Sequence, residues 1–167
     1  MTCVFKEGCV KIPRATKKIL ALQSQVIEDF TKQIPQDLWD VRRGPEVWTL
    51  REHLYHLADV QKLLLGRIKL ILAEERPVIQ PYFPDNEPAL AELFPSIGAA
   101  LTTYRRLRDK QLKLFAKARK SDWKKQALHG EYRLYSLSII ARHLVIHDDW
   151  HLYRMEEIWL TKDEYFH

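Results

Sequence analysis

Prolines and the helical spacing of apolar residues constrain this fold more than any other feature of the sequence. Between Pro13 and Pro35, apolar residues recur every three to four positions, which is the spacing of one face of a helix. A second such segment opens at Thr49 and is expected to run to about Glu75, because Pro77 stops it. No long alternation of apolar and polar residues, the pattern of a half-buried strand, runs through the sequence. These patterns predict a helical protein.

Two more helices are predicted after the second. The third starts near Pro95 or Ser96 and continues to about Ala118, and the fourth runs from Ser136, a good N-cap, to about Leu160. The second helix opens with the capping box TLRE, residues 49–52, whose Thr and Glu side chains can each bind the other's backbone amide. The faces expected to be buried are Ile19, Leu22, Val26 and Phe30 on the first helix; Leu50, Leu54, Leu57, Val60, Leu64 and Ile68 on the second; and Ile97, Leu101, Tyr104, Leu107, Leu112 and Phe115 on the third.

Four helices of this length predict an all-α protein, a four-helix bundle, with residues 1–167 forming a single domain. A long loop with three prolines, at residues 76–87, joins the second and third helices. A polar, irregular stretch, Ser121–Tyr135, precedes the fourth. One long and one medium connection argue against a stack of simple up-and-down hairpins.

Histidines are the residues most able to carry chemistry here. Five of the seven fall on the second and fourth predicted helices: His53, His56, His143, His147 and His151. The last three are spaced by four, so each neighbouring pair shares a helix face and could bind one metal ion. Spacing alone allows either His143/His147 or His147/His151 as that pair, with His56 as the third ligand. Three imidazoles leave an open coordination position, as catalytic sites do. The alternative is that these histidines only pack, half-buried, with one hydrogen bond each.

Other polar and aromatic residues near the histidines have simpler interpretations. Asp59, one turn past His56, can orient an imidazole or form a surface salt bridge. Asp148 and Asp149 are expected to face solvent, and His53 to lie at the surface or pack at the helix start. The tryptophans that accompany these residues are expected to fill the core or an interface: Trp39, Trp48, Trp150 and Trp159.

Positive charge is concentrated in one part of a chain whose net charge is +5. The segment Tyr104–Lys125 holds ten basic residues and only two acidic ones, Asp109 and Asp122. We interpret it as the solvated face of a helix. The competing hypothesis is a non-enzymatic helical module that binds nucleic acid or another acidic partner through this face. Few aromatic residues interleave with the charges, so stacking on bases, and hence nucleic-acid binding, is disfavoured.

The location of the protein is expected to be cytoplasmic. The N-terminal residues show no apolar stretch typical of a secretory signal, and the longest apolar runs are too short to span a membrane. The two cysteines, Cys3 and Cys9, are expected to be reduced and structurally minor, with a redox pair as the weaker alternative because their spacing is not C-x-x-C.

A short internal sequence repeat links the two predicted helices that carry the histidines. WTLREHLYH at residues 48–56 aligns with YSLSIIARH at residues 135–143, each with an aromatic residue, a hydroxyl cap, a leucine and a histidine seven residues after the cap. Both helices are therefore expected to start alike and to place a histidine on the same face, unless the match is a coincidence.

Two longer segments resemble a known family. WDVRRGPEVWTLREHLYHLAD at residues 39–59 and ARHLVIHDDWHLYRMEEI at residues 141–158 are similar to the DinB/YfiT-like superfamily of four-helix-bundle metalloproteins. The matching motifs are His56-Leu57-Ala58-Asp59 and the pair His147 and His151. The resemblance implies a divalent metal, nickel or zinc, on His56, His147 and His151, leaves His143 as a packing residue, and implies a homodimer.

The activity that the resemblance implies is broad. Similar proteins include thiol S-transferases and thiol-dependent isomerases, and many have no assigned reaction. This chain departs from the family at Arg154, where many members have Gln three residues after the last His. Arg154 can bind an anionic substrate group or pair with Glu157. We therefore expect a metal-dependent hydrolase or thiol transferase that acts on a small molecule at an open three-histidine metal site. A third hypothesis is a dimeric bundle with purely structural histidines.

Overall fold

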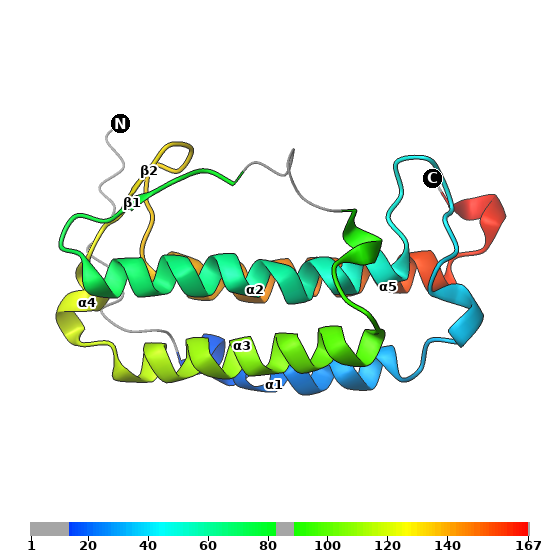
Figure 1. Cartoon of the computed structure of the whole chain (residues 1–167), viewed down its shortest axis with the longest axis horizontal. Helices are drawn as coiled ribbons and strands as arrows, with labels where there is room; N and C mark the ends of the chain where they lie inside the picture. Colours follow the sequence, from blue (N-terminus) through cyan, green and yellow to red (C-terminus); the bar gives the residue numbers. More distant parts are fainter. Residues whose placement is uncertain (1–13, 83–88, 167) are drawn as a thin grey trace.

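The computed structural model describes residues 14–82 and 89–166. Four long helices make up most of this part of the chain and lie side by side (Figure 1): α1 (Arg14–Thr31), α2 (Leu50–Ala73), α3 (Ile97–Lys117) and α5 (Leu137–Leu160). All four were predicted, within a few residues at each end. Cys3 and Cys9 lie outside the described residues.

Serine and threonine caps fix where three of these helices begin. The Thr49 hydroxyl accepts a hydrogen bond from the Glu52 amide at 3.2 Å, and the Thr49 amide donates to the Glu52 carboxylate at 2.7 Å, so the predicted capping box is confirmed. The hydroxyls of Ser96 and Ser136 accept from backbone amides three residues later. The sequence repeat between residues 48–56 and 135–143 therefore reflects two helices that start alike.

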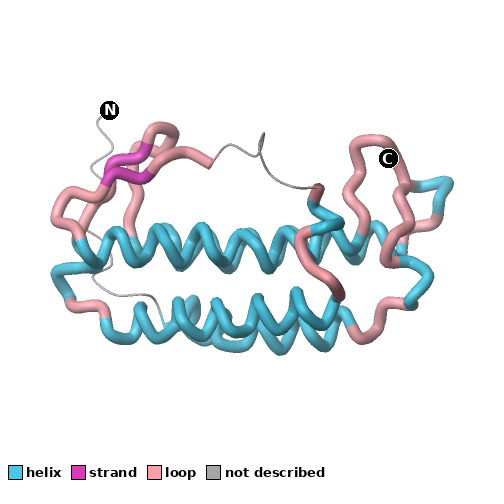
Figure 2. Tube along the Cα trace, in the orientation of Figure 1, coloured by secondary structure: helices cyan, strands magenta, loops and turns pink. Residues whose placement is uncertain are grey.

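The stretch before the last helix is more ordered than predicted. It contains a five-residue helix, α4 (Lys120–Lys124), and a short strand, β2 (Leu128–His129). Strand β2 pairs in parallel with β1 (Val78–Ile79) from the loop after α2, in the register Val78–Leu128 and Ile79–His129 (Figure 2). Strands of two residues carry no periodic pattern, which is why the sequence did not indicate them. Single 3₁₀ turns complete the described structure: Gln36–Leu38, Leu90–Glu92 and Asp163–Tyr165.

The bundle is not built from simple hairpins, as the connections had indicated. Helix α2 packs against α3 and α5, and α1 packs against the same two helices, so the consecutive helices α1 and α2 are diagonal. Helices α1 and α5 run in one direction and α2 and α3 in the other (Figure 1). Since α2 and α3 are parallel neighbours, the chain between them has to return along the bundle, which explains the long connection.

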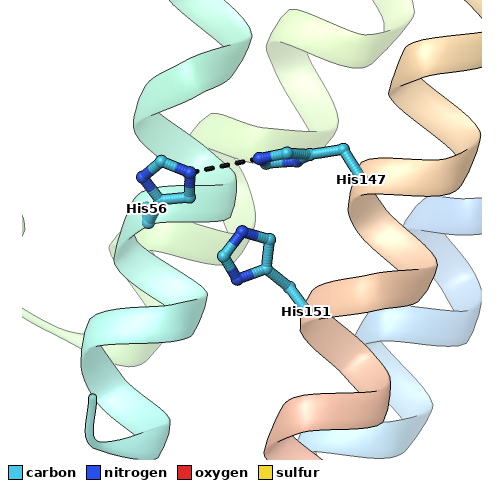
Figure 3. Close-up of side chains that lie close together, drawn as sticks. All are labelled: His56, His147 and His151. Carbon is cyan, nitrogen blue, oxygen red and sulfur yellow. Dashed lines mark hydrogen bonds between the residues drawn. The ribbon is translucent and has the colours of Figure 1, made fainter. Parts of the chain in front are cut away.

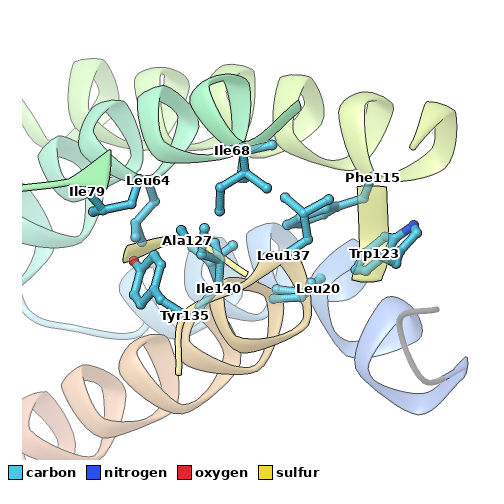
Figure 4. Close-up of a cluster of buried hydrophobic side chains, with 13 residues drawn as sticks. Leu20, Leu64, Ile68, Ile79, Phe115, Trp123, Ala127, Tyr135, Leu137 and Ile140 are labelled. Carbon is cyan, nitrogen blue, oxygen red and sulfur yellow. The ribbon is translucent and has the colours of Figure 1, made fainter. Parts of the chain in front are cut away.

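Two apolar clusters form the core, one toward each end of the bundle. The first joins Leu20 of α1, Ile68 of α2 and Phe115 of α3 to the start of α5 (Figure 4). The second gathers Ile27, Leu54 and Met155 with aromatic residues such as Trp39. Burial of these side chains supplies the main favourable free energy of folding, about 25 cal/mol per Å² of apolar surface.

A buried polar network lies between the helices. Arg108 of α3 donates to Asp148 of α5 at 2.6 Å and to Gln61 of α2 at 3.2 Å, and the Tyr104 hydroxyl donates to the same Asp148 oxygen at 2.5 Å. Arg108 and Asp148 are both fully buried. The prediction that Asp148 faces solvent was therefore wrong, and Arg108 does not belong to the solvated basic face. Each charge is accommodated in the interior because a residue on another helix pairs with it.

The buried face of α1 was predicted wrongly at three of its four positions, whereas Phe30 packs against the core as expected. The side chains in the core are Leu20, Gln23, Ile27 and Thr31, whereas Ile19, Leu22 and Val26 are exposed. The buried Gln23 donates to Asp149 of α5 at 2.8 Å, and the Thr31 hydroxyl donates to the carbonyl of Glu28 at 2.9 Å. These hydrogen bonds allow two polar residues to occupy the inner face. None of the described helices is long and apolar enough to cross a membrane.

Candidate metal centre

Three histidines from two helices converge at the interface of α2 and α5. His56 comes from α2, and His147 and His151 come from α5 (Figure 3). One ring nitrogen of each lies within 4.8 Å of the other two, and Nε2 of His56 is 3.1 Å from Nε2 of His147. Nitrogens around a tetrahedral ion, with bonds of about 2.0–2.1 Å, are separated by about 3.4 Å. The cluster therefore has the size and the donor type that one divalent ion requires.

The helix packing explains why these three meet. Helices α2 and α5 are antiparallel, so residues that advance along α2 face residues that go back along α5: His53 lies opposite His151, and His56 opposite His147. His147 and His151 are one turn apart and share a face. His143, one turn earlier, is exposed and stacks on the His147 ring at 5.6 Å, outside the cluster.

His53 is a fourth histidine at this site, although it was predicted to lie at the surface or to pack at the helix start. Its side chain is only 3% exposed, and its Nδ1 lies 2.8 Å from Nδ1 of His151. One of these nitrogens must donate to the other. Because Nδ1 of His151 is engaged in this way, Nε2 is the nitrogen of His151 left for an ion. A hydrogen bond on the second nitrogen commonly fixes the orientation of a histidine ligand.

Burial favours the neutral form of these rings. Desolvation lowers the pKa of His53 and of His56 to about 4, helped in His53 by the charge of Arg154 and in His56 by His147. Desolvation, followed by repulsion from His147, holds the pKa of His151 far below its usual range. Only a neutral imidazole has a lone pair to offer a metal, so the site favours ligation over protonation at neutral pH.

Two tryptophans pack against the histidine cluster. The Trp48 ring lies 5.1 Å from His56 and stacks against His151, with centroids 5.9 Å apart. The Trp150 ring meets His151 edge-on at 4.7 Å. Trp48 is half-buried and Trp150 is exposed, so of the two roles predicted for them, in the core or at an interface, neither fills the core. They form an apolar wall beside the polar cluster.

The two other predicted site residues have charged partners. Asp59 pairs with Lys62 at 2.8 Å, the surface salt bridge that was one of its two interpretations. Arg154 pairs with Glu157, again one of two interpretations. The positive charge of Arg154 still acts on the site electrostatically, because it helps to lower the pKa of His53.

Sequence reasoning missed four residues of the site. Asp148 belongs to the site because its Oδ1 lies 3.9 Å from Nδ1 of His147, but neither it nor Trp48 or Trp150 gave a signal that separates a site residue from a surface or core residue. His53 did give one, because it lies three residues before His56 and so shares its face of α2.

The basic segment Tyr104–Lys125 is exposed apart from its inward-facing side chains. Four of its basic residues line a groove between α1 and α3, together with Glu28 and Asp109: Arg105, Arg106, Lys110 and Lys113. Arg105 forms an ion pair with Glu28. Acidic neighbours offset part of this charge, as on an ordinary solvated helix face.

Comparison with known proteins gives three findings. The family described as the DinB superfamily matches residues 19–161. A protein of Oceanobacillus iheyensis named "Putative metal-dependent hydrolase" is 45% identical over 47 residues, which are 28% of this chain and 26% of that protein. The structure of YfiT from Bacillus subtilis, described as a probable metal-dependent hydrolase with an unusual four-helix bundle topology, superposes with a TM-score of 0.75 at 19% identity, over 91% of this chain and 90% of YfiT. The last likeness shows a shared four-helix-bundle fold.

Proposed function

The chain belongs to the DinB superfamily, and on that premise we propose that it is a metal-dependent enzyme whose divalent ion is held by His56, His147 and His151. The observation that carries the proposal is the convergence of these three side chains, with ligand atoms within 4.8 Å of one another. The names of two similar proteins, one given as a "putative" and the other as a "probable" metal-dependent hydrolase, support hydrolysis as the reaction. Thiol transfer is the alternative that the family resemblance leaves open.

The chemistry of the site follows from its ligand set. A divalent ion held by His56, His147 and His151 would keep a coordination position open, where it would lower the pKa of a bound water or thiol and so supply a nucleophile at neutral pH. Nickel and zinc both suit imidazole nitrogen.

The surrounding residues prepare the ligands for this role. His53 holds the Nδ1 side of His151, which leaves Nε2 for the ion. Trp48 packs on His56 and His151 and shields that side of the cluster from water. Low local dielectric strengthens the interactions of charges inside a site. We assign a small-molecule substrate to this site, because an open groove lies beside the cluster.

Metal analysis of protein purified without an affinity tag tests the proposal, since appended histidines would themselves bind nickel. We expect about one nickel or zinc ion per chain in the wild type and a loss of binding in His56→Ala, His147→Ala and His151→Ala. His143→Ala, one turn from His147, is the matched control and should keep the ion. Metal content that is absent from the wild type, or equal in all four variants, would overturn the proposal.

The loaded enzyme then distinguishes the two reactions. Hydrolysis of p-nitrophenyl acetate that does not depend on added thiol supports a hydrolase. Conjugation of a small thiol to 1-chloro-2,4-dinitrobenzene, in which the sulfur displaces chloride, supports a thiol transferase. Either activity should disappear in His147→Ala.

A further inference from the structure

A groove of about 440 Å³ opens beside the histidine cluster. It is lined by Glu46, Val47, Trp48, His53, Trp150, Tyr153 and Arg154. Its volume falls within the range of small-molecule sites, about 300–1,000 Å³. Two of its residues also contact the cluster: His53 binds His151, and Trp48 packs on His56 and His151. A molecule in this groove therefore sits next to the candidate metal centre.

The walls of the groove are aromatic and unusually exposed. Trp150 is 52% exposed and Tyr153 is 62% exposed, and Trp48 is half-buried. Large aromatic side chains left open to water around a hollow mark a binding surface, because covering them is favourable. Flat apolar groups suit such walls, since offset stacking and edge contacts both become available.

The polar floor of the groove offers a hydrogen-bond donor. Among the described residues, His53 has a hydrogen-bond partner only at Nδ1, which is His151, and its Nε2 has none. When an ion takes Nε2 of His151, Nδ1 of His151 carries the ring hydrogen and donates it to His53. The hydrogen of a neutral His53 is then on Nε2, where it can be donated to a ligand. The placement of this hydrogen on Nε2 of His53 rests on the proposed function, because it requires an ion on His151.

Charge in the groove selects the kind of acceptor. Arg154 binds Glu157 through one nitrogen, Nη1, and its remaining N–H groups stay available for a ligand. The lining also contains one carboxylate, that of the exposed Glu46. The one guanidinium is matched by two carboxylates, its partner Glu157 and the lining residue Glu46, so the groove has no excess positive charge of its own, which disfavours a doubly charged phosphate more than a singly charged anion. A carboxylate matches the planar fork of arginine.

We propose that this groove binds a small organic carboxylate with a flat apolar body, which stacks on Trp48 and Trp150 while Arg154 and His53 hold the carboxylate. The site is new relative to the three-histidine cluster and uses none of its ligands. It places the anionic end of a substrate against His53, the residue that supports His151.

Titration of the zinc-loaded full chain with phenylacetate tests the proposal. The ¹⁵N-labelled protein has five tryptophans, and their indole N–H signals report the groove directly. We expect phenylacetate to shift the signals of Trp48 and Trp150 and to leave those of the three other tryptophans unchanged. The Trp150→Phe variant assigns one of the two signals. 2-Phenylethanol has the same ring without the charge and should bind about tenfold more weakly or worse, as should inorganic phosphate.

Variants separate the two donors from general effects of charge. Arg154→Gln should weaken phenylacetate binding about tenfold or more and leave 2-phenylethanol binding unchanged. His53→Phe keeps a ring of similar size, removes both nitrogens and should also weaken binding of the anion. Arg106→Gln, an exposed arginine on α3, is the matched control and should behave as the wild type.

Several results would overturn the carboxylate site. The first is that phenylacetate shifts the indole signals of neither Trp48 nor Trp150. The second is that Arg154→Gln binds phenylacetate as tightly as the wild type does. The third is that phosphate binds at Arg154 more tightly than phenylacetate. A change of molecular mass in Trp150→Ala without any ligand binding would instead assign the groove to contact between two chains. Zinc content is measured on the same samples, and the titration is repeated on metal-free protein. Arg154-dependent binding without zinc would keep this site even if the proposed metal function failed.

Discussion

The buried carboxylate oxygen Oδ1 of Asp148 lies 3.9 Å from Nδ1 of His147, its neighbour in the chain. Within the described part of the protein, neither atom has a hydrogen-bond partner, and both are inaccessible to water. The other oxygen of Asp148 receives hydrogen bonds from Arg108 and Tyr104, which anchor the carboxylate. Small movements would join the two free atoms, and a metal on Nε2 of His147 would favour that bond because Nδ1 must then donate.

The first prediction concerns the Asp148–Arg108 pair. Asp148→Ala leaves the charge of Arg108 buried without its partner, so we expect the free energy of unfolding to fall by about 3–5 kcal/mol. Urea unfolding measures the loss. Asp149→Ala, at the next position but exposed, is the matched control and should cost less, about 1–3 kcal/mol, since it leaves the amide of the buried Gln23 without its acceptor but leaves no charge unpaired. Equal losses in the two variants would show that Arg108 does not depend on Asp148.

The second prediction concerns the contribution of the metal to stability. The apolar clusters should keep the metal-free protein folded, unlike a zinc finger. Binding to the native state should add about 2.7 kcal/mol at a hundredfold excess over Kd, which raises Tm by about 5–10 °C at this chain length. Circular dichroism melts with and without zinc or nickel at pH 7.5 measure the rise, which should fade only as the pH falls toward 4, because burial lowers the pKa of the ligand His56 to about 4.

His147→Ala should remove that rise while the protein stays helical, and His143→Ala should keep it. Loss of the helical signal when metal is removed by a chelator would mean that the ion holds the fold together. The interpretation of the cluster as an open, catalytic site would then lose its main support.

The third prediction concerns the pH dependence of the metal-free protein. Free histidine binds a proton below about pH 6.5, whereas burial lowers the pKa of His53 and His56 to about 4. Between these values the unfolded state holds more protons than the native state, so stability falls as the pH drops from about 6.5 toward 4. Each such histidine contributes a slope of up to about 1.4 kcal/mol per pH unit.

Urea unfolding at pH 7.5, 6.0 and 5.0 gives this slope. His53→Phe removes one of the titrating groups and should make the slope shallower over the same range. A free energy of unfolding that stays constant from pH 7.5 to 5.0 would show that these rings are protonated equally in both states.

The fourth prediction concerns the exposed face of α1. Ile19, Leu22 and Val26 form an apolar stripe that the fold leaves uncovered. The resemblance to the DinB/YfiT-like superfamily implies a homodimer, and we expect this stripe to form its interface. Leu22→Glu should therefore convert a dimer into a monomer in sedimentation velocity experiments. Lys17→Glu, exposed on the same helix but on another side, should leave the dimer intact. A monomeric wild type would refute the expectation.

Local features of the sequence determined where the helices begin and end. The Thr49 box and the Ser96 and Ser136 caps act within one turn, and the prolines limit helices without help from the rest of the fold. The three histidines of the cluster could also be identified from the sequence as candidate ligands, because spacing alone places His147 and His151 on one face of a helix. Choosing that pair over His143/His147 required the family resemblance, since both pairs have the same spacing.

The tertiary structure decided which side of each helix faces inward and which polar residues are buried. Successive residues on a helix differ in direction by about 100°, so a neighbouring helix determines whether Leu20 or Ile19 enters the core. Arg108 and Asp148 read as surface residues because their burial is tolerable only when another helix brings a partner. His53 became a site residue for the same reason: His151, ninety-eight positions away, is placed 2.8 Å from it by the antiparallel packing of α2 and α5.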